Sequence, residues 1–200
     1  MKNKIPKILL YSRLFFALFI ISITLYPFFN SKGIVLSLMY LGLLTDVFDG
    51  IIARKLNIST VNFRVLDTAF DLLFYFSILF FIITINHHVF SENKIFILII
   101  LTLEALMYFI SLVRFGKLPS PHAILSKFWG LYIIIEFTLL ICQIRGNHFL
   151  VSLIIGMFVH LDRVVIYILL RNWEHDIPSS YHALLIRQGE KIKRIKLFNG

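Results

Sequence analysis

The sequence is poor in charged residues and in cysteine. Only 16% of its residues are charged and 58% are hydrophobic, whereas soluble domains carry about 25% charged residues. This apolar excess is larger than a buried core can hold, which excludes an ordinary soluble domain and indicates a protein that lies in lipid. The single cysteine, Cys142, excludes an internal disulfide. Because it lies in an apolar stretch, we expect it to be a buried, passive thiol.

Acidic residues are scarce as well. The chain has 11 Asp and Glu against 20 Lys and Arg, a formal net charge of +9. In a soluble protein this excess would suggest nucleic acid as a partner. In a membrane protein it is explained by basic residues that stay on the cytoplasmic side, beside anionic headgroups. We therefore expect membrane lipids, and no nucleic acid, as partners.

Six apolar segments of about 20 residues are each long enough to cross a bilayer. They cover residues 8–28, 34–53, 63–85, 95–113, 128–144 and 149–170. The links between them are short and rich in helix-breaking residues, and no small-residue cleavage site follows the first segment. The predicted fold class is therefore all-α: an integral membrane domain of six transmembrane helices over residues 1–172. A basic, solvated cytoplasmic tail is expected over residues 173–200.

The positions of the basic residues predict the orientation. With a cytoplasmic N-terminus, the outer loops contain Lys32, Lys94 and Arg145, and the apolar segments contain Arg13 and Arg163. The other fifteen of the 20 Lys and Arg residues then lie inside, as the positive-inside rule requires. An even number of helices places the C-terminus in the cytoplasm too. We expect an inner or plasma membrane location.

Four aspartates lie in the second and third apolar segments, where charges are costly and usually functional. Asp46 and Asp49 are three residues apart, and Asp67 and Asp71 are four apart, so each pair shares a helix face. A helical hairpin would bring both pairs together at the cytoplasmic end. Their repulsion favours a bound cation, and oxygen ligands suit Mg²⁺, Mn²⁺ or Ca²⁺. Because Mg²⁺ usually bridges substrate phosphates, the pattern points to phosphoryl-type chemistry.

Two small residues share the face of the first aspartate pair. Gly50 and Ala53 lie four and seven residues after Asp46. They would leave room for a ligand, or else allow close helix packing.

The stretch from Asp46 to Arg54, followed by Asp67 and Asp71, resembles the signature of the CDP-alcohol phosphatidyltransferases. That signature reads D-x-x-D-G-x-x-A-R and then G-x-x-x-D-x-x-x-D, and Phe63 stands at its second glycine. Pro6 and Arg13 are similar to the family's N-terminal pattern P-N-x-x-T-x-x-R.

The resemblance implies an activity. It is the metal-dependent transfer of a phosphatidyl group from a CDP-linked lipid, such as CDP-diacylglycerol, to an alcohol acceptor, with release of CMP, in phospholipid biosynthesis. The implied cofactor is a pair of Mg²⁺ or Mn²⁺ ions, at an active site facing the cytoplasm in a homodimer. The implied metal ligands are Asp46, Asp49, Asp67 and Asp71. Asp71 would also be the general base, and the implied nucleotide contacts are Gly50, Ala53 and Arg54.

Three further basic residues form a candidate acceptor site. Arg114, Lys127 and Arg163 fall near the predicted cytoplasmic ends of the fourth, fifth and sixth segments. They are explained either by the positive-inside rule or by a pocket for an anionic acceptor. Glycerol 3-phosphate is then the first choice, with serine, inositol phosphate or another lipid as alternatives.

Other ionisable residues in apolar segments are expected to pair structurally. These are Glu104, Glu136, His160 and Asp162.

Two other functional hypotheses remain open at this point. Buried carboxylates could bind translocated cations in a transporter, although transport sites favour the bilayer midplane over one boundary. A degenerate family member could act only as a partner subunit, because Phe63 replaces the glycine. We expect the third helix to begin near Val65, capped by Asn62, which leaves Phe63 in the loop.

Overall fold

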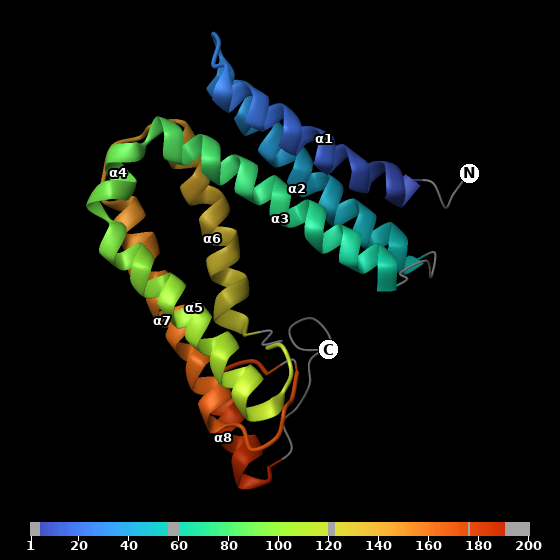
Figure 1. Cartoon of the computed structure of the whole chain (residues 1–200), viewed down its shortest axis with the longest axis vertical. Coiled ribbons are helices and arrows are strands. Elements are labelled where there is room, and N and C mark those ends of the chain that lie inside the picture. The colour runs from blue at the N-terminus through green and yellow to red at the C-terminus, as the bar shows by residue number, and fades with distance from the viewer. Residues whose placement is uncertain (1–4, 56–60, 120–122, 176, 191–200) are drawn as a thin grey trace. The chain divides into compact units, whose positions relative to one another are not determined.

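The computed structural model (Figure 1) describes residues 5–55, 61–119, 123–175 and 177–190. It describes their side chains except those of residues 5–7, 49–51, 53–55, 61–65, 67 and 68. Every regular element in these ranges is a helix. In order, the helices are α1 (Ile5–Leu25), α2 (Ser31–Lys55), α3 (Val61–Ile85), α4 (His87–Glu92), α5 (Lys94–Phe115), α6 (Ile124–Ile141), α7 (His148–Leu169) and α8 (Ser180–Gln188).

Several of these helices can cross a membrane. Among the described residues, five helices are long and apolar enough, and α3 contributes a shorter apolar stretch, Ala69–Ile85. Large side chains such as Phe15, Phe109 and Phe158 are more than half exposed, which suits a surface that faces lipid tails. The chain is therefore an all-helical integral membrane protein in the part described. The sixth span and the orientation of the termini stay predictions.

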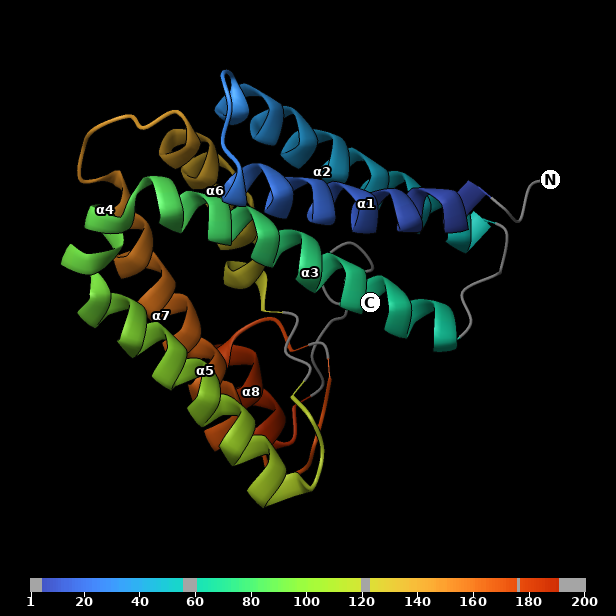
Figure 2. The ribbon, with the colours of Figure 1, turned by 45° about the horizontal axis from the view of Figure 1, so that its top comes forward.

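The chain forms two compact units. The first unit comprises Met1–His87 and Leu140–Ile144, and the second comprises His88–Leu139 and Arg145–Gly200. In the first unit α1 packs against both α2 and α3, which make few contacts with each other. Figures 1 and 2 show these three helices side by side, running in alternating directions.

The core of the first unit follows a stripe along α1. Leu10, Ala17 and Ile20 are fully buried, and their spacing places them on one helix face. They lie in a core completed by α3 residues such as Phe74 and Ile78, which are equally buried. Because lipid tails are as apolar as these side chains, close packing between the helices stabilises the bundle more than transfer out of solvent does.

A glycine sets the approach of α2 to α3. The ring of Phe74 lies against the α2 backbone at Gly42, where a Cβ would be 2.2 Å from Phe74 Cζ. No side chain larger than hydrogen fits there unless the ring moves. This contact lies one turn before Asp46 on α2 and three residues after Asp71 on α3, so it positions the segments that contain these aspartates.

In the second unit, α5 packs along α7, and α8 packs against the last turns of α7. Met107, Tyr167 and Ala183 belong to its fully buried core. The indole of Trp129 lies on α7 at Gly156, where a Cβ would be 2.8 Å from the ring. These contacts join α5, α6, α7 and α8.

Two features of the chain after α5 differ from the sequence-based expectations. Helix α6 ends at Ile141, three residues earlier than predicted, so Cys142 lies in the following turn and is exposed. The expectation of a buried thiol was wrong. The expected solvated tail contains helix α8, whose Ala183 is fully buried.

Candidate active site

An arginine lies at the centre of the site. Arg13 occupies the buried stripe of α1 between Leu10 and Ala17, and its side chain is only 1% exposed. Its Nη1 donates a hydrogen bond to Oδ1 of Asp46 at 3.0 Å and another to Oδ1 of Asp71. One nitrogen from α1 thus joins a carboxylate of α2 to a carboxylate of α3.

The charges explain why this arrangement forms. Two carboxylates that approach each other between apolar helices repel, and a buried charge is tolerated only when it is paired. Arg13 provides this pairing for both. The side chains of Asp46 and Asp71 remain 40% and 26% exposed. Among the described residues, nothing donates a hydrogen bond to the Oδ2 atom of either aspartate, so each keeps an acceptor that a ligand can use.

The backbone places the other two aspartates close by along the helices. Asp49 lies one turn beyond Asp46 on α2, and Asp67 lies one turn before Asp71 on α3. In Figure 2 the end of α2 and the start of α3 lie at the same end of the first unit as the start of α1. The hairpin predicted from the sequence is therefore present. The side chains of Asp49 and Asp67 lie outside the described residues, as do those of the candidate nucleotide ligands Gly50, Ala53 and Arg54.

The two described carboxylates are of the kind that ligates a divalent cation. The oxygens of Asp46 and Asp71 converge on a single cationic atom, Arg13 Nη1, and carboxylate oxygens are the ligands that Mg²⁺ and Mn²⁺ favour. No group of three His, Cys, Asp or Glu residues that could hold a metal occurs among the described residues. The complete set of four aspartates extends beyond them, so the metal site stays a prediction.

The start of α3 corrects one expectation. Helix α3 begins at Val61, not near Val65, because Asn62 does not cap it but lies inside its first turn. Phe63 is therefore a helical residue, one turn before Asp67 and two turns before Asp71 in the helix register. Its side chain, and with it the question of the nucleotide site, lies outside the described residues.

The three basic residues proposed for the acceptor belong to the second unit. Arg114 donates from Nη1 and Nη2 to the carbonyl oxygens of Tyr167, Ile168 and Leu170 at 2.7–2.8 Å. It thereby caps the C-terminal end of α7, where carbonyls lack helical partners. Lys127, in the first turn of α6, is exposed.

Arg163 forms an ionic network with Glu104 and His160. Its Nη1 and Nη2 donate to the two carboxylate oxygens of Glu104 at 2.7 and 3.1 Å, and His160 Nδ1 lies 2.9 Å from Glu104 Oε2. The network joins α5 to α7. Two of its buried atoms, Arg163 Nε and His160 Nε2, have no hydrogen-bond partner in the part of the chain described.

The other two residues expected to pair, Glu136 and Asp162, also have partners. Glu136 Oε1 lies 2.7 Å from His148 Nδ1, and Asp162 Oδ1 accepts a hydrogen bond from the Ser180 N–H at 3.0 Å. The expectation of structural pairing for Glu104, Glu136, His160 and Asp162 is confirmed.

The role of Arg13 was not predicted from the sequence. Its position in an apolar helix was a usable signal, because an intramembrane arginine needs an anionic partner. Sequence spacing alone does not show which face of α1 meets the two aspartate helices.

Helices that can cross a membrane, together with acidic residues paired with an arginine in a helical bundle, define a membrane protein with a polar, acidic site. A family model described as CDP-alcohol phosphatidyltransferase matches residues 3–174. No curated protein and no solved structure matches the chain. The matched region contains Arg13 and all four aspartates and covers most of the chain. The chain belongs to the CDP-alcohol phosphatidyltransferase family. It is therefore a transferase of phospholipid synthesis, which sets the transporter hypothesis aside.

Proposed function

We propose that this protein transfers a phosphatidyl group from CDP-diacylglycerol, or a similar CDP-lipid, to a small alcohol and releases CMP. The observation that supports this most is the convergence of Asp46 and Asp71 on Arg13 within a chain of this family. With divalent cations bound, an acid-rich site at the end of a helical bundle could accept an anionic diphosphate while the acyl chains of the same substrate stay in lipid.

The transfer needs one proton acceptor and one stable leaving group. The alcohol oxygen attacks the β-phosphorus, the bond from this phosphorus to the CMP oxygen breaks, and CMP leaves with the bonding electrons. The alcohol proton passes to Asp71, whose Oδ2 accepts no hydrogen bond from the described residues. Arg13 holds the other carboxylate oxygen, which fixes the orientation of the base.

The four aspartates are the proposed ligands of two divalent cations, Mg²⁺ or Mn²⁺. Such ions supply charge neutralisation for the diphosphate and for the departing CMP. Gly50, Ala53 and Arg54 are proposed to contact the nucleotide. Their positions in the last two turns of α2 lie next to the aspartate pair in sequence, which supports this assignment.

An anionic acceptor, with glycerol 3-phosphate first, is proposed for the basic residues of the second unit. The buried atoms Arg163 Nε and His160 Nε2, which lack partners among the described residues, support a polar ligand there. Arg163 already shares its charge with Glu104, and Arg114 is engaged with carbonyl oxygens. Substituting either would also remove these internal bonds. Lys127 is exposed, and Lys127→Gln should raise the KM of the acceptor and leave that of the CDP-lipid unchanged.

The proposed function is tested by CMP release from CDP-diacylglycerol. The full-length protein, purified in detergent with Mg²⁺ or Mn²⁺, is offered glycerol 3-phosphate, serine, inositol phosphate and buffer alone. We expect CMP release that depends on both the metal and one acceptor. The matched control is Asp46→Asn, which should release none. Absence of release with every acceptor would favour the degenerate family member that Phe63 suggests.

A further inference from the structure

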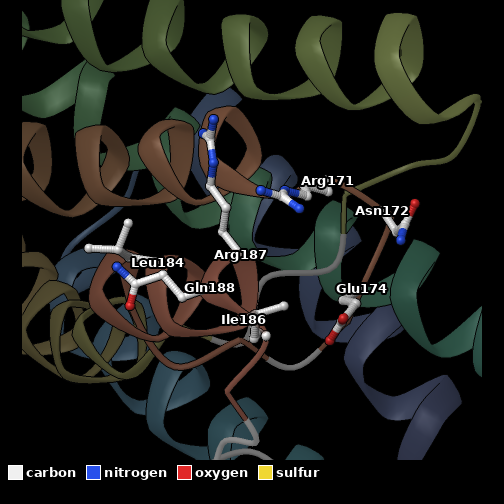
Figure 3. A pocket seen from close by; sticks show the side chains of 8 residues that line it. Arg171, Asn172, Glu174, Leu184, Ile186, Arg187 and Gln188 are labelled. Carbon is white, nitrogen blue, oxygen red and sulfur yellow. The ribbon is translucent and has the colours of Figure 1, made fainter.

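A polar pocket of about 480 Å³ lies at the C-terminal end of the second unit. Its walls come from the segment after α7, with Arg171 and Glu174, and from α8, with Leu184, Arg187 and Gln188. Figure 3 shows these side chains around the pocket. The family match ends at residue 174, so α8 is a feature of this chain beyond the matched region.

The α8 wall is fixed to α7. Ala183 is fully buried against the core of the second unit. The Ser180 N–H at the start of α8 donates to Asp162 Oδ1 of α7 at 3.0 Å. At its other end, α8 is closed by Gly189, whose φ of 89° suits glycine. Arg187 therefore projects from a helix whose start is bound to α7 and whose end is capped by glycine.

The two arginines of the pocket have no anionic partner among the described residues. Neither Arg171 nor Arg187 forms an ion pair or a side-chain hydrogen bond with any described residue. In Figure 3 the guanidinium of Arg171 points toward the side chain of Arg187, while the carboxylate of Glu174 points away from both. Two guanidinium groups on one side of a pocket present forked donors that match the oxygens of a phosphate.

The helix dipole does not account for both charges. The carbonyl oxygens at the end of α7 already accept hydrogen bonds from Arg114, so Arg171 is not needed to compensate them. Positive charge beside a membrane helix is common on the cytoplasmic side. A pocket that holds two arginines without a partner in the described part of the chain is not explained by that rule.

The position of the pocket indicates the source of the phosphate. The apolar span of α7 ends at Leu169, two residues before Arg171, so the pocket lies where the hydrocarbon core gives way to headgroups. Beside it, α8 exposes the large apolar side chains of Tyr181 and Leu184, which can contact acyl chains. We propose that Arg171 and Arg187 bind the phosphate of an anionic phospholipid headgroup, at a site separate from the aspartates.

The test is the affinity of the full-length protein for phosphatidylglycerol, measured in neutral detergent by native mass spectrometry. The double variant Arg171→Gln/Arg187→Gln is expected to bind it about tenfold or more weakly than the wild type, because it loses charge-assisted hydrogen bonds. The control Lys94→Gln/Arg145→Gln removes the same charge from two other exposed positions and should bind like the wild type. Lipid bound elsewhere is common to all three proteins, so their difference reports this pocket.

Further arms distinguish the sources of the anion. Phosphatidylcholine, whose phosphate charge is balanced by choline, should lose less affinity in the double variant than phosphatidylglycerol does, and millimolar inorganic phosphate should not displace phosphatidylglycerol. CMP release in micelles without phosphatidylglycerol should be the same in the double variant and the wild type. Equal phosphatidylglycerol affinity in the double variant, or an equal loss in the control, would overturn the proposal. Displacement by inorganic phosphate would overturn the lipid assignment and make a free anion the ligand.

Discussion

Arg13 is the residue on which the geometry of the site depends. It is buried, and it pairs with one carboxylate from each of the two aspartate helices. The sequence predicted the aspartate positions from their spacing and from the family signature. It did not predict that an arginine of the first helix joins them. The spacing of apolar residues shows which face of a helix is buried, but it does not show which other helices pack against that face.

We predict that Arg13→Gln destabilises the protein without metal. Removing the guanidinium leaves Asp46 and Asp71 to repel each other, and a loss of about 1–3 kcal/mol in unfolding free energy is expected. Thermal unfolding in detergent with a chelator measures it. Added Mg²⁺ should recover part of the loss, because a bound cation replaces the missing charge. Arg13→Lys, which keeps the charge, should lose less. An unchanged Tm in Arg13→Gln would contradict the pairing.

Substitutions of Asp71 and Asp46 are expected to affect turnover and ligand binding differently. Asp71→Asn should reduce kcat by about 10²–10⁴-fold, the usual contribution of a general base. Its affinity for the CDP-lipid should change little. Asp46→Asn should abolish turnover and weaken metal binding as well. CMP release and metal titration measure both. Parallel losses of binding and turnover in Asp71→Asn would make it chiefly a metal ligand.

At the scale of the elements, the apolar segments were predicted well and their ends less so. The second span was predicted over residues 34–53, and α2 covers Ser31–Lys55. The predicted start of α3 was wrong because Asn62, although a good cap by residue type, lies inside the helix. Helix α8 was not predicted, because nine residues of mixed polarity do not make a long apolar segment; contacts with α7 stabilise it instead.

The contact of Gly42 with Phe74 tests how α2 and α3 are positioned. Gly42→Ala would place a Cβ 2.2 Å from Phe74 Cζ. We expect it to lower the unfolding free energy by about 1–3 kcal/mol, the usual cost of overpacking. Turnover should fall with it, since the aspartates lie one turn away. Thermal unfolding and CMP release measure the two effects.

Two variants make this test specific. Gly130→Ala is the matched control, because a Cβ at Gly130 meets nothing within 4 Å. It should be neutral or slightly stabilising in α6. Gly42→Ala/Phe74→Leu should recover stability relative to Gly42→Ala, because the smaller side chain makes room. If Gly42→Ala and Gly130→Ala behave alike, the contact of the Phe74 ring with the α2 backbone is not required.

At the scale of the whole molecule, the orientation in the membrane is the main untested prediction. It places both termini in the cytoplasm and the turn after α6 outside. The exposed Cys142 in that turn is the single cysteine of the chain, so it reports this directly. A membrane-impermeant maleimide should label it in sealed vesicles whose outer face is outward, and not in inverted vesicles.

The reciprocal variant controls for vesicle integrity. In a Cys142→Ser background, Gln188→Cys places the thiol in α8, on the predicted cytoplasmic side. It should be labelled only in inverted vesicles. The predicted orientation has α7 crossing the membrane between these two positions. Labelling of Cys142 and of Gln188→Cys from the same side would contradict it.

The central claim is that the phosphatidyl group itself is transferred. CDP-diacylglycerol labelled at its β-phosphorus follows that group directly. With Mg²⁺ or Mn²⁺ and the preferred alcohol, the account predicts that the label appears in a new phospholipid, that the released CMP carries none, and that Asp71→Asn forms almost no product. Label that stays in CDP-diacylglycerol, or that appears only in phosphatidic acid whichever alcohol is present, would contradict it.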